Sequence, residues 1–407
     1  MDGGSADHAG AVICRPAGDK AQQGSPTKKS RRPHPQTMSN FSKADHRHMA
    51  RALKLARNGL TTAHPNPRVG CVIVRDAEVV GEGWHRAAGE AHAEVIALAA
   101  AGDRARGGTV YVTLEPCTKT GRTGPCTEAL QRAGVARVIF AVPDPSQNPE
   151  GRHTALENAG IEVSSGLMQS EARKLNEGFL MRIGRHRPFV RLKVAASLDG
   201  ATAMRNGQSR WITGEAARRD VQRLRAMSGA ILTGIGTVLA DDPLLTVRNA
   251  SLLIEQPIRV IVDSRLRMPA AARLVNQPGR TVVFCAEDAG RAPLVDAGVS
   301  VRRVASAAGG VDLPAVLREL ADLEVNDVLV EAGPGLSGSL LAGGHVDELV
   351  IYQAPHIMGS ETMGMFATPG RAELTDRTQL HVLDVRCVGQ DLRIVARPLP
   401  PSAHAED

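Results

Sequence analysis

The chain has 407 residues, too many for one ordinary hydrophobic core, so at least two domains are expected. Its composition, 43% hydrophobic and 23% charged with a net charge of +6, is that of a globular protein, and no apolar run approaches the roughly 20 residues that cross a membrane. The N-terminus has no basic segment followed by an apolar stretch, so we expect a cytoplasmic protein whose six cysteines are metal ligands, catalytic thiols or core residues rather than disulfides.

The first segment, residues 1–44, is rich in Gly, Ser, Pro and Gln and is expected to be a disordered extension. Its basic run KKSRRPHP could contact RNA or act as a targeting address, or it could be a solvated part of the extension.

A regular pattern begins at Asp45 and continues to Gly166. Apolar spacing and glycine stops predict helices and strands in alternation. The expected helices cover residues 46–59, 91–102, 126–134 and 151–160, and the expected strands cover 68–74, 108–114, 136–142 and 161–166. Such alternation predicts an α/β domain, with helices on the faces of a sheet.

A helical connector is expected within residues 167–188, and a second alternating α/β series runs from 189 to 398, before a short tail at 399–407. This second series ends in two expected strands, LHVLDVRCV and DLRIVARP. Three cysteines, Cys71, Cys285 and Cys387, lie in apolar strand-like runs and are expected in the core.

Two further cysteines share the stretch EPCTKTGRTGPC, where Cys117 and Cys126 each follow a proline. His92 and Glu94 open the helix expected at 91–102, and residues two apart on a helix point roughly 200° apart. Both can therefore serve one site only if His92 lies at or before the first turn. Cys126 is expected to begin a helix, where the N–H groups favour a thiolate. One histidine, two cysteines and an open fourth position are typical of a catalytic zinc site, so one Zn²⁺ per chain is expected.

An H-x-E sequence followed by P-C and a second cysteine is the zinc-deaminase signature, although here eight residues separate the two cysteines. Zinc in such a site activates water, and Glu94 would move the proton to the leaving ammonia. The alternatives are a helix-cap histidine, ordinary core cysteines, or a structural zinc completed by His85 or another cysteine.

In the second series, NDVLVEAGPGLSGSLL predicts a strand, a glycine turn and a helix that could bind phosphate at its N-terminus. The acidic residue of an ordinary NAD site is missing, which leaves dinucleotide binding open. Ser264, Arg265 and Arg267 follow an expected strand and would suit the 2′-phosphate of NADP, or they form a solvated basic loop.

Several motifs resemble the bifunctional deaminase/reductase family of riboflavin biosynthesis. They are HPNPRVGCVIV, GEGWHRAAGEAHAEV, VYVTLEPC and GRTGPC in the first half, and KVAASLDG, SRWITGEAARRDVQRLRA, TGIGTVLADDPLLTVR, VDS and VEAGPGLSGSLL in the second. The resemblance covers about residues 45–398. It implies a cytidine-deaminase-like α/β/α domain at 45–166 and a dihydrofolate-reductase-like α/β domain at 189–398 that uses NADPH.

The resemblance also implies site residues. NADPH would contact Ala195, Trp211, Thr237, Asp241, Ser264, Gly333, Pro334, Gly335, Leu336, Ser337, Gly338 and Ser339. The substrates would contact Asn66 in the first half and Ser209, Arg225, Leu245, Arg248 and Glu331 in the second. Lys193 and Asp241 are candidate electrostatic or proton partners of the reduction.

The implied activities are hydrolytic deamination of a phosphoribosylamino-pyrimidinone, then reduction of its ribosyl group to ribityl. The chain departs from the family pattern at Thr118-Lys119-Thr120 and at Ser146-Gln147, and both segments are expected to line the deaminase substrate site. The expected partner is a small phosphorylated pyrimidine, without nucleic acid or membrane, and a homo-oligomer is possible.

Two rival interpretations remain. One is a nucleoside or tRNA deaminase fused to an unrelated NADP-dependent reductase. The other is a zinc-containing nucleic-acid-binding module. The second is weakened because aromatic residues make up only 2% of the chain, too few for base-stacking platforms, and because Glu94 would have no role in a structural site.

Overall fold

The computed structural model describes residues 41–118, 124–147, 154–249, 251, 255–287, 290–307, 310–370 and 372–399. These ranges leave out most of the expected extension, including Cys14, as well as Lys119, Thr120 and the residues from 400 onward. No helix among the described residues is long and apolar enough to cross a membrane.

The first sheet has five strands in the order β2-β1-β3-β4-β5. Their bounds are β1 Gly70–Arg75, β2 Glu78–Trp84, β3 Thr109–Leu114, β4 Arg137–Val142 and β5 Glu162–Ser165. β1 pairs antiparallel with β2 and β3, whereas β3, β4 and β5 are parallel. β3 and β4 are buried along almost their whole length, as expected of parallel strands that are covered on both faces.

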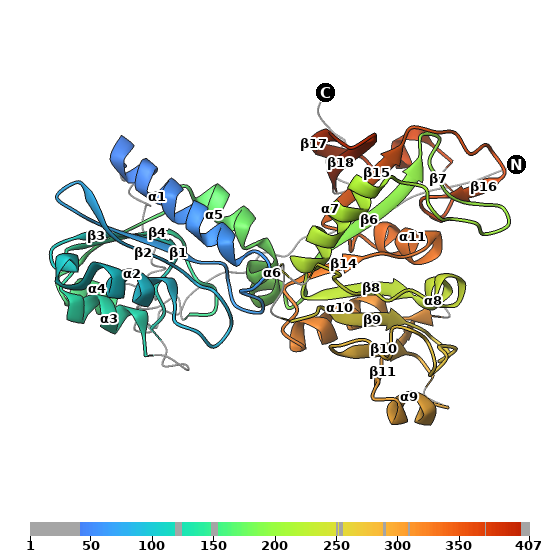
Figure 1. Ribbon diagram of the computed structural model, residues 1–407, viewed down its shortest axis with the longest axis horizontal. Helices are drawn as coiled ribbons and strands as arrows, with labels where there is room; N and C mark the ends of the chain where they lie inside the picture. The colour runs from blue at the N-terminus through green and yellow to red at the C-terminus, as the bar shows by residue number, and fades with distance from the viewer. Residues whose placement is uncertain are drawn as a thin grey trace, which may run out of the picture. The chain divides into compact units, whose positions relative to one another are not determined.

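Helices cover both faces of this sheet. Figure 1 shows α1 and α5 over one face and α2, α3 and α4 over the other, so the expected α/β/α arrangement is confirmed. The helices are α1 Lys43–Ala56, α2 Ala93–Ala101, α3 Cys126–Ala133, α4 Thr154–Asn158, α5 Gln169–Leu175 and α6 Glu177–Arg185. Short 3₁₀ turns occupy Arg57–Gly59, Gly102–Ala105 and Leu374–Asp376. α1 begins two residues before Asp45 because Ser42 and Asp45 cap its N-terminus reciprocally.

Strand β2 was missing from the sequence-based expectations. Its GEGW sequence has little β propensity, but glycine is required at two of its positions. A Cβ at Gly81 would lie 2.2 Å from the carbonyl oxygen of Ala97, and one at Gly83 would lie 2.3 Å from that of Ala93. The two glycines therefore let α2 pack directly on the sheet, which fixes the helix that carries His92 and Glu94.

The second sheet has nine strands in the order β11-β10-β9-β8-β14-β6-β15-β18-β17. The strands from β11 to β15 are parallel, and β18 and β17 are antiparallel additions at one edge. Their bounds are β6 Phe189–Ser197, β8 Ala230–Gly234, β9 Ile258–Val262, β10 Thr281–Cys285, β11 Ser300–Arg303, β14 Asp327–Val330, β15 Glu348–Ala354, β17 Leu380–Val388 and β18 Asp391–Pro398. Two small pairs, which we had not expected, are β7 Ala201–Met204 with β16 Thr362–Gly364 and β12 Ser306–Ala307 with β13 Gly310–Val311.

Alternating side chains of the parallel strands pack against helices on opposite faces. On β14, Val328 and Val330 pack with α10 and α11, whereas Leu329 packs with α7 on the other face. The helices are α7 Glu215–Ala226, α8 Ile235–Asp241, α9 Ala292–Asp296, α10 Leu313–Asp322 and α11 Pro334–Ala342. Because α8 and α11 begin where β8 and β14 end, their N-termini meet at the carboxyl edge of the sheet, the usual ligand edge of an open parallel sheet.

The expectation that Cys387 lies in the core is wrong, because its side chain is exposed on β17, the terminal strand of the nine-stranded sheet. Val382 and Val385 on the same strand are also more than half exposed. Cys71 and Cys285 are buried, as expected.

Candidate functional site

Three ligand atoms converge in the first half: one nitrogen of His92 and the sulfurs of Cys117 and Cys126, all within 4.8 Å of one another. Nδ1 of His92 lies 3.1 Å from Sγ of Cys126 and 3.5 Å from Sγ of Cys117. A tetrahedral zinc ion with ordinary bond lengths separates a nitrogen and a sulfur ligand by about 3.5 Å. The donor set and its spacing therefore fit Zn²⁺.

Helix ends position all three ligands. His92 is the N-cap residue of α2, with extended backbone, as a shared site with Glu94 requires. Cys126 is the first residue of α3, and its backbone N–H points to Sγ of Cys117 at 3.4 Å. Thr127 donates from both its backbone N–H and its hydroxyl to the carbonyl of Cys117, at 3.2 and 3.3 Å. The loop after β3 is thus tied to the start of α3, which explains why two cysteines share one short stretch.

The two thiols differ in acidity. Hydrogen bonds from Cys126 and His92 lower the pKa of the Cys117 thiol to about 4. In the metal-free pair the Cys117 sulfur and burial raise the pKa of Cys126, and the thiolate expected of Cys126 in the zinc-bound state stays a prediction. Two thiolates in contact repel each other, so without a cation the pair holds only one negative charge.

Glu94 lies in the first turn of α2 and is only 4% exposed. Burial raises the pKa of its carboxyl group to about 7. A carboxyl group with such a pKa beside the metal ligands can both accept and release a proton near neutral pH, which is the behaviour of a general acid–base.

His85 has a role that the sequence analysis considered only as a fourth zinc ligand. Its Nε2 lies 3.0 Å from the side-chain amide of Asn66 and its Nδ1 lies 3.2 Å from the carbonyl oxygen of Ala91, next to His92. With both ring nitrogens engaged, His85 links Asn66 to the zinc-binding turn, and its ring meets that of His92 edge-on at 5.6 Å. The motif GEGWH already contained this histidine, but no local pattern specifies its partners.

The two segments that depart from the family pattern contact each other. Oε1 of Gln147 accepts hydrogen bonds from the backbone N–H and the hydroxyl of Thr118, at 2.9 and 3.0 Å. Nε2 of Gln147 donates to the carbonyl of Pro116, next to Cys117. The departures thus form one connected structure beside the zinc ligands.

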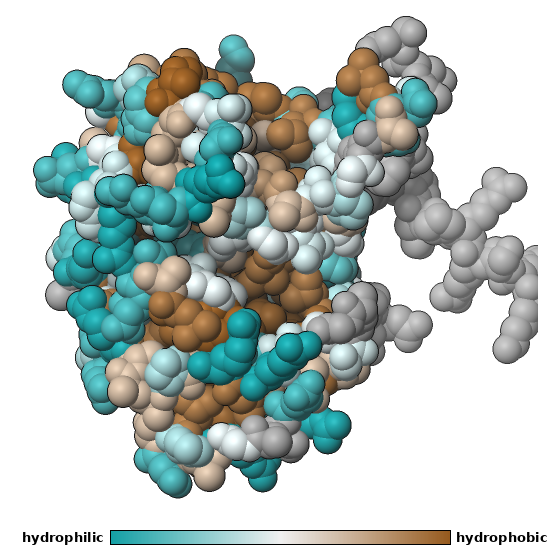
Figure 2. Space-filling model, turned by 90° about the vertical axis from the view of Figure 1, so that its right-hand side faces the viewer, coloured by the Kyte–Doolittle hydropathy of each residue, from teal (hydrophilic) through white to brown (hydrophobic). Residues whose placement is uncertain are grey.

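In the second half, two glycine-capped helix N-termini meet. Gly234 caps α8 and Gly333 caps α11. A Cβ at Gly234 would touch Leu336 at 3.4 Å, and one at Gly333 would lie 3.9 Å from the hydroxyl of Thr237. The N–H groups of two helices thus converge at the sequence-predicted phosphate turn, which suits the pyrophosphate of a dinucleotide. Figure 2 shows several patches of apolar side chains among hydrophilic ones on the face that it presents.

Ser264 lies just past the end of β9, on the same edge of the sheet as these helices. Its carbonyl accepts hydrogen bonds from the N–H groups of Ala286 and Glu287, and the buried Asp263 accepts one from the N–H of Met268. This fixed turn leaves the side chains of Arg265 and Arg267 exposed. Ala195 lies near the end of β6 in the same parallel sheet.

Glu331 and Arg225 form a bidentate ion pair, with N···O distances of 2.6 and 3.1 Å, and Lys193 lies 3.7 Å from the same carboxylate. Burial alone would raise the pKa of Glu331, but the two cations hold it at about 2. Since Arg225 also donates to the carbonyl of Thr246, its guanidinium holds Glu331 in place. Contact of Arg225 with the substrate stays a prediction.

The remaining predicted contacts are spread around this edge. Trp211 is 67% exposed and stacks with Arg218, whose guanidinium carbon is 4.6 Å from the ring centroid. Arg248 is exposed, whereas Leu245 is buried with a left-handed backbone (φ 49°). Asp241 ends α8 and pairs with Arg210, next to Ser209.

Family models match both halves of the chain: residues 42–142 match the cytidine and deoxycytidylate deaminase zinc-binding region, and residues 188–394 match the RibD C-terminal domain. The riboflavin biosynthesis protein RibD of Escherichia coli K12 is 49% identical over 86% of this chain and 98% of its own length. This chain belongs to the RibD family. Its Haemophilus influenzae relative of the same name is 41% identical over 89% of this chain and 99% of the relative.

Solved RibD structures have the same fold. The structure described as Acinetobacter baumannii RibD, form 1, has a TM-score of 0.82 at 44% identity, and the match covers 88% of this chain and 99% of that chain. A Thermotoga maritima protein described as a diaminohydroxyphosphoribosylaminopyrimidine deaminase/5-amino-6-(5-phosphoribosylamino)uracil reductase has a TM-score of 0.77 at 31% identity, with the same coverage.

Membership of the RibD family confirms the α/β fold class and the combination of a zinc-binding deaminase domain with a reductase domain. The chain is therefore a bifunctional deaminase/reductase of riboflavin biosynthesis, with zinc and NADPH as its cofactors. The rival interpretations are not favoured, because RibD relatives match across both halves rather than across the deaminase alone.

Proposed function

We propose that the first half deaminates 2,5-diamino-6-(5-phosphoribosylamino)pyrimidin-4(3H)-one and that the second half reduces the resulting 5-amino-6-(5-phosphoribosylamino)uracil to its ribityl form. The observation that carries this proposal is the open His92–Cys117–Cys126 cluster with the buried Glu94 beside it, in a chain that also carries the RibD reductase domain. We further propose the division at 45–166, 167–188 and 189–398.

In the deaminase site, His92, Cys117 and Cys126 would hold the zinc, which would activate water for attack on the ring carbon that bears the amino group. Glu94 accepts a proton from that water and delivers it to the departing nitrogen, so that ammonia leaves and a carbonyl remains. Asn66, whose amide N–H is directed to His85, presents its side-chain oxygen to the substrate.

In the reductase site, the turn from Gly333 to Ser339 and Thr237 bind the NADPH pyrophosphate, and Ser264 with its neighbouring arginines reads the 2′-phosphate. NADPH held by these residues would supply the hydride for C1′ of the ribose. The ring C–O bond breaks, and the ring oxygen takes a proton to become a hydroxyl. Glu331, held by Arg225 and Lys193, stays ionised beside the substrate, and Lys193 or Asp241 is the candidate proton partner.

We also propose a cytoplasmic enzyme that works without nucleic acid and forms a homo-oligomer. Strand β17 supports the last point, because it is the terminal strand of a nine-stranded sheet and exposes Leu380, Val382 and Val385. A long apolar edge strand favours association, and two copies of one strand can pair about a twofold axis.

The test is to incubate the purified enzyme with the diaminopyrimidinone substrate, with and without NADPH. Ammonia should appear in both reactions, and NADPH should be oxidised only after deamination. Zinc removal should stop ammonia release while the supplied aminouracil intermediate is still reduced. NADPH oxidation on the undeaminated substrate at the same rate would contradict the assignment of the two halves.

A further inference from the structure

The loop from His64 to Arg68 belongs to the deaminase half but has contacts in two directions. Asn66 faces the deaminase site, where its amide contacts Nε2 of His85 at 3.0 Å. Pro65 and Arg68, on either side of Asn66, are bound instead by the connector helices and the reductase half. The position of Asn66 thus depends on groups far from it in the sequence.

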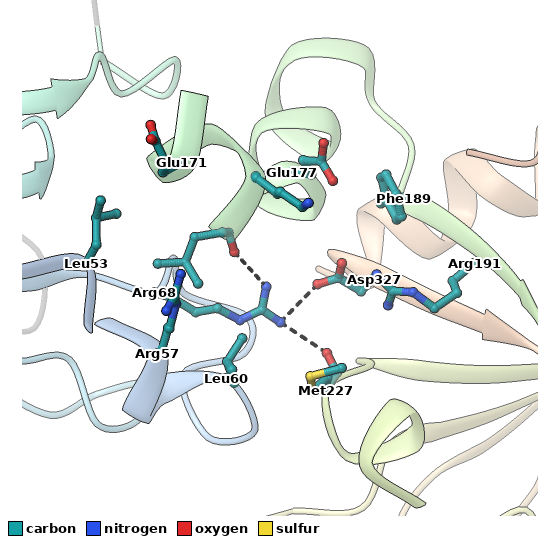
Figure 3. Close-up of a pocket in the computed structure, with 12 residues that line it drawn as sticks. Leu53, Arg57, Leu60, Arg68, Glu171, Glu177, Phe189, Arg191, Met227 and Asp327 are labelled. Atoms are coloured by element: carbon teal, nitrogen blue, oxygen red, sulfur yellow. Dashed lines mark hydrogen bonds and ion pairs between the residues drawn. The ribbon is translucent and has the colours of Figure 1, made fainter. Parts of the chain in front are cut away.

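Of these two residues, Arg68 has more anchors, meaning hydrogen-bonding groups outside the loop that hold it in place. Its backbone N–H and carbonyl form a reciprocal pair of hydrogen bonds with the side-chain amide of Asn176, at 2.8 and 2.9 Å. Its guanidinium donates to the carbonyls of Leu175 and Met227, both at 3.1 Å, and to the carboxylate of Asp327 at 3.2 Å. Figure 3 shows this side chain extending from its loop towards Met227 and Asp327.

Pro65 is held on the other side. Its carbonyl accepts hydrogen bonds from the amide of Asn326, at 2.8 Å, and from Arg182, at 3.5 Å. Arg182 in turn donates to Oδ1 of Asn326 at 2.6 Å. The two reductase-half residues that hold the loop through their side chains, Asn326 and Asp327, are therefore consecutive residues at the start of β14, and both are buried.

A displacement at these anchors reaches Asn66 because the loop is stiff. Proline on both sides of Asn66 fixes two backbone φ angles, so the segment has few ways to absorb a displacement at Arg68. The side chains of the Arg68–Asp327 pair are only 13% and 8% exposed. Neutralising one member would leave the other charge buried without its partner, and a buried unpaired charge forces movement.

Space for that movement exists. A cavity of about 450 Å³ lies beside the pair and is lined by Arg68, Asp327, Phe189 and Met227 among others (Figure 3). Among its charged groups, Arg191 pairs with Glu348 and Glu177 pairs with Arg397. The cavity therefore leaves Arg68 room to move away when Asp327 no longer attracts it.

We infer that Arg68 is a positioning residue through which Asn326 and Asp327 of the reductase half hold Asn66 in place for deamination. This inference rests on the proposed contact of Asn66 with the deaminase substrate. The reductase half thus contributes to the first reaction without touching its substrate.

The test uses the full-length enzyme loaded with zinc. Asp327→Asn and Arg68→Ala should each raise the KM of deamination about tenfold, with a smaller change in kcat, because a misplaced binding group weakens substrate binding while the zinc site remains. Zinc content should stay at the wild-type level, and reduction of the supplied intermediate should change by less than twofold. Arg68→Lys keeps the charge but cannot reach all three acceptors, so it should recover part of the loss.

Asp220→Asn is the matched control, since it breaks another largely buried arginine–carboxylate pair of the reductase half, that with Arg393, and neither residue lines the cavity. It should leave the KM of deamination unchanged. A tenfold rise in this control, or a wild-type KM in both Asp327→Asn and Arg68→Ala, would overturn the inference.

A double-mutant cycle separates positioning from general stability. Asn66→Ala alone should raise the KM of deamination, and adding Asp327→Asn should then have little further effect. If Asn66→Ala has no effect, the proposed substrate contact is wrong. If Asn66→Ala has its effect and the two effects multiply, the contact stands and the coupling through Arg68 is wrong.

Discussion

Gly229 lies directly against the imidazole ring of His64: a Cβ at Gly229 would come within 2.3 Å of the ring atoms Cε1 and Nε2. The N–H of Gly229 donates to the carbonyl of Asp327, and its carbonyl accepts from the N–H of Ile258, both at 2.9 Å. The glycine is thus fixed between neighbouring strands of the second sheet, and the contact with His64 has no room for a methyl group.

Gly229→Ala should therefore lower the free energy of unfolding by about 1–3 kcal/mol, as overpacking of a filled site does, and should raise the KM of deamination by displacing the loop. Urea unfolding and steady-state kinetics measure the two effects. Gly184→Ala, in α6, is the control: a Cβ there meets nothing within 4 Å, so it should cost no stability. Equal stability of the two variants would contradict this account of the contact.

His64 should make the enzyme less stable in mild acid. Burial lowers the pKa of His64 from 6.5 to about 4; the charge of Asp327 opposes this shift, and the charges of Arg68 and Arg182 add to it. Between these values the unfolded chain binds a proton that the folded chain does not, so stability falls as the pH drops from about 6.5 to about 4. At about 1.4 kcal/mol per pKa unit the total loss is roughly 3 kcal/mol.

Urea unfolding of the wild type and His64→Gln across this pH range checks the prediction. The variant should lose stability less steeply in acid. His381→Gln, at an exposed position on β17, should keep the wild-type slope. If His64→Gln lost stability with falling pH as steeply as the wild type, the acid sensitivity would come from other groups.

The zinc ligands can be separated from the proton carrier. Cys117→Ala should abolish zinc binding in elemental analysis, because a single histidine and one cysteine remain. Glu94→Gln should keep one zinc per chain but release ammonia about 10² to 10⁴ times more slowly, since the proton transfer is lost. Cys387→Ser removes an exposed thiol and should change neither property. Full zinc occupancy in Cys117→Ala would show that Cys117 is not a zinc ligand.

The enzyme should prefer NADPH to NADH by tenfold or more in kcat/KM. A hydrogen bond to a charged group contributes roughly 1.5–3 kcal/mol, which corresponds to about tenfold or more in affinity. Ser264→Asp should reverse the preference by repelling the 2′-phosphate, while activity with NADH is retained. Equal kcat/KM values for the two cofactors in the wild type would show that the Ser264 turn does not read the phosphate.

The proposed homo-oligomer should depend on β17. Val385→Lys places a charge on the exposed edge strand and should shift the enzyme towards the monomer in light scattering. Val295→Lys is the control, because Val295 is similarly exposed on α9, away from this strand. A wild-type mass for Val385→Lys would exclude β17 as the association surface.

The zinc site could be predicted from the sequence because its geometry is local: helix starts place His92 and Cys126, and a short loop brings in Cys117. The Arg68–Asp327 contact could not, since 259 residues separate its members and no periodicity marks a pair of this kind. Cys387 was misplaced because an apolar strand-like run cannot tell a central strand from the last one. β2 was overlooked because its glycines serve helix packing rather than strand propensity.

The reciprocal hydrogen bonds between the side chain of Asn176 and the backbone of Arg68 limit how this enzyme can be rearranged by protein engineers. A deaminase cut out at residue 166 would lose Asn176, Arg182, Asn326 and Asp327 together, and the loop around Asn66 would keep its prolines but none of these anchors. A chimera that grafts this deaminase onto a foreign reductase would need matching groups at the corresponding positions. The part of the chain that must be transferred together is therefore larger than the deaminase domain and includes the connector helices and the first residues of β14.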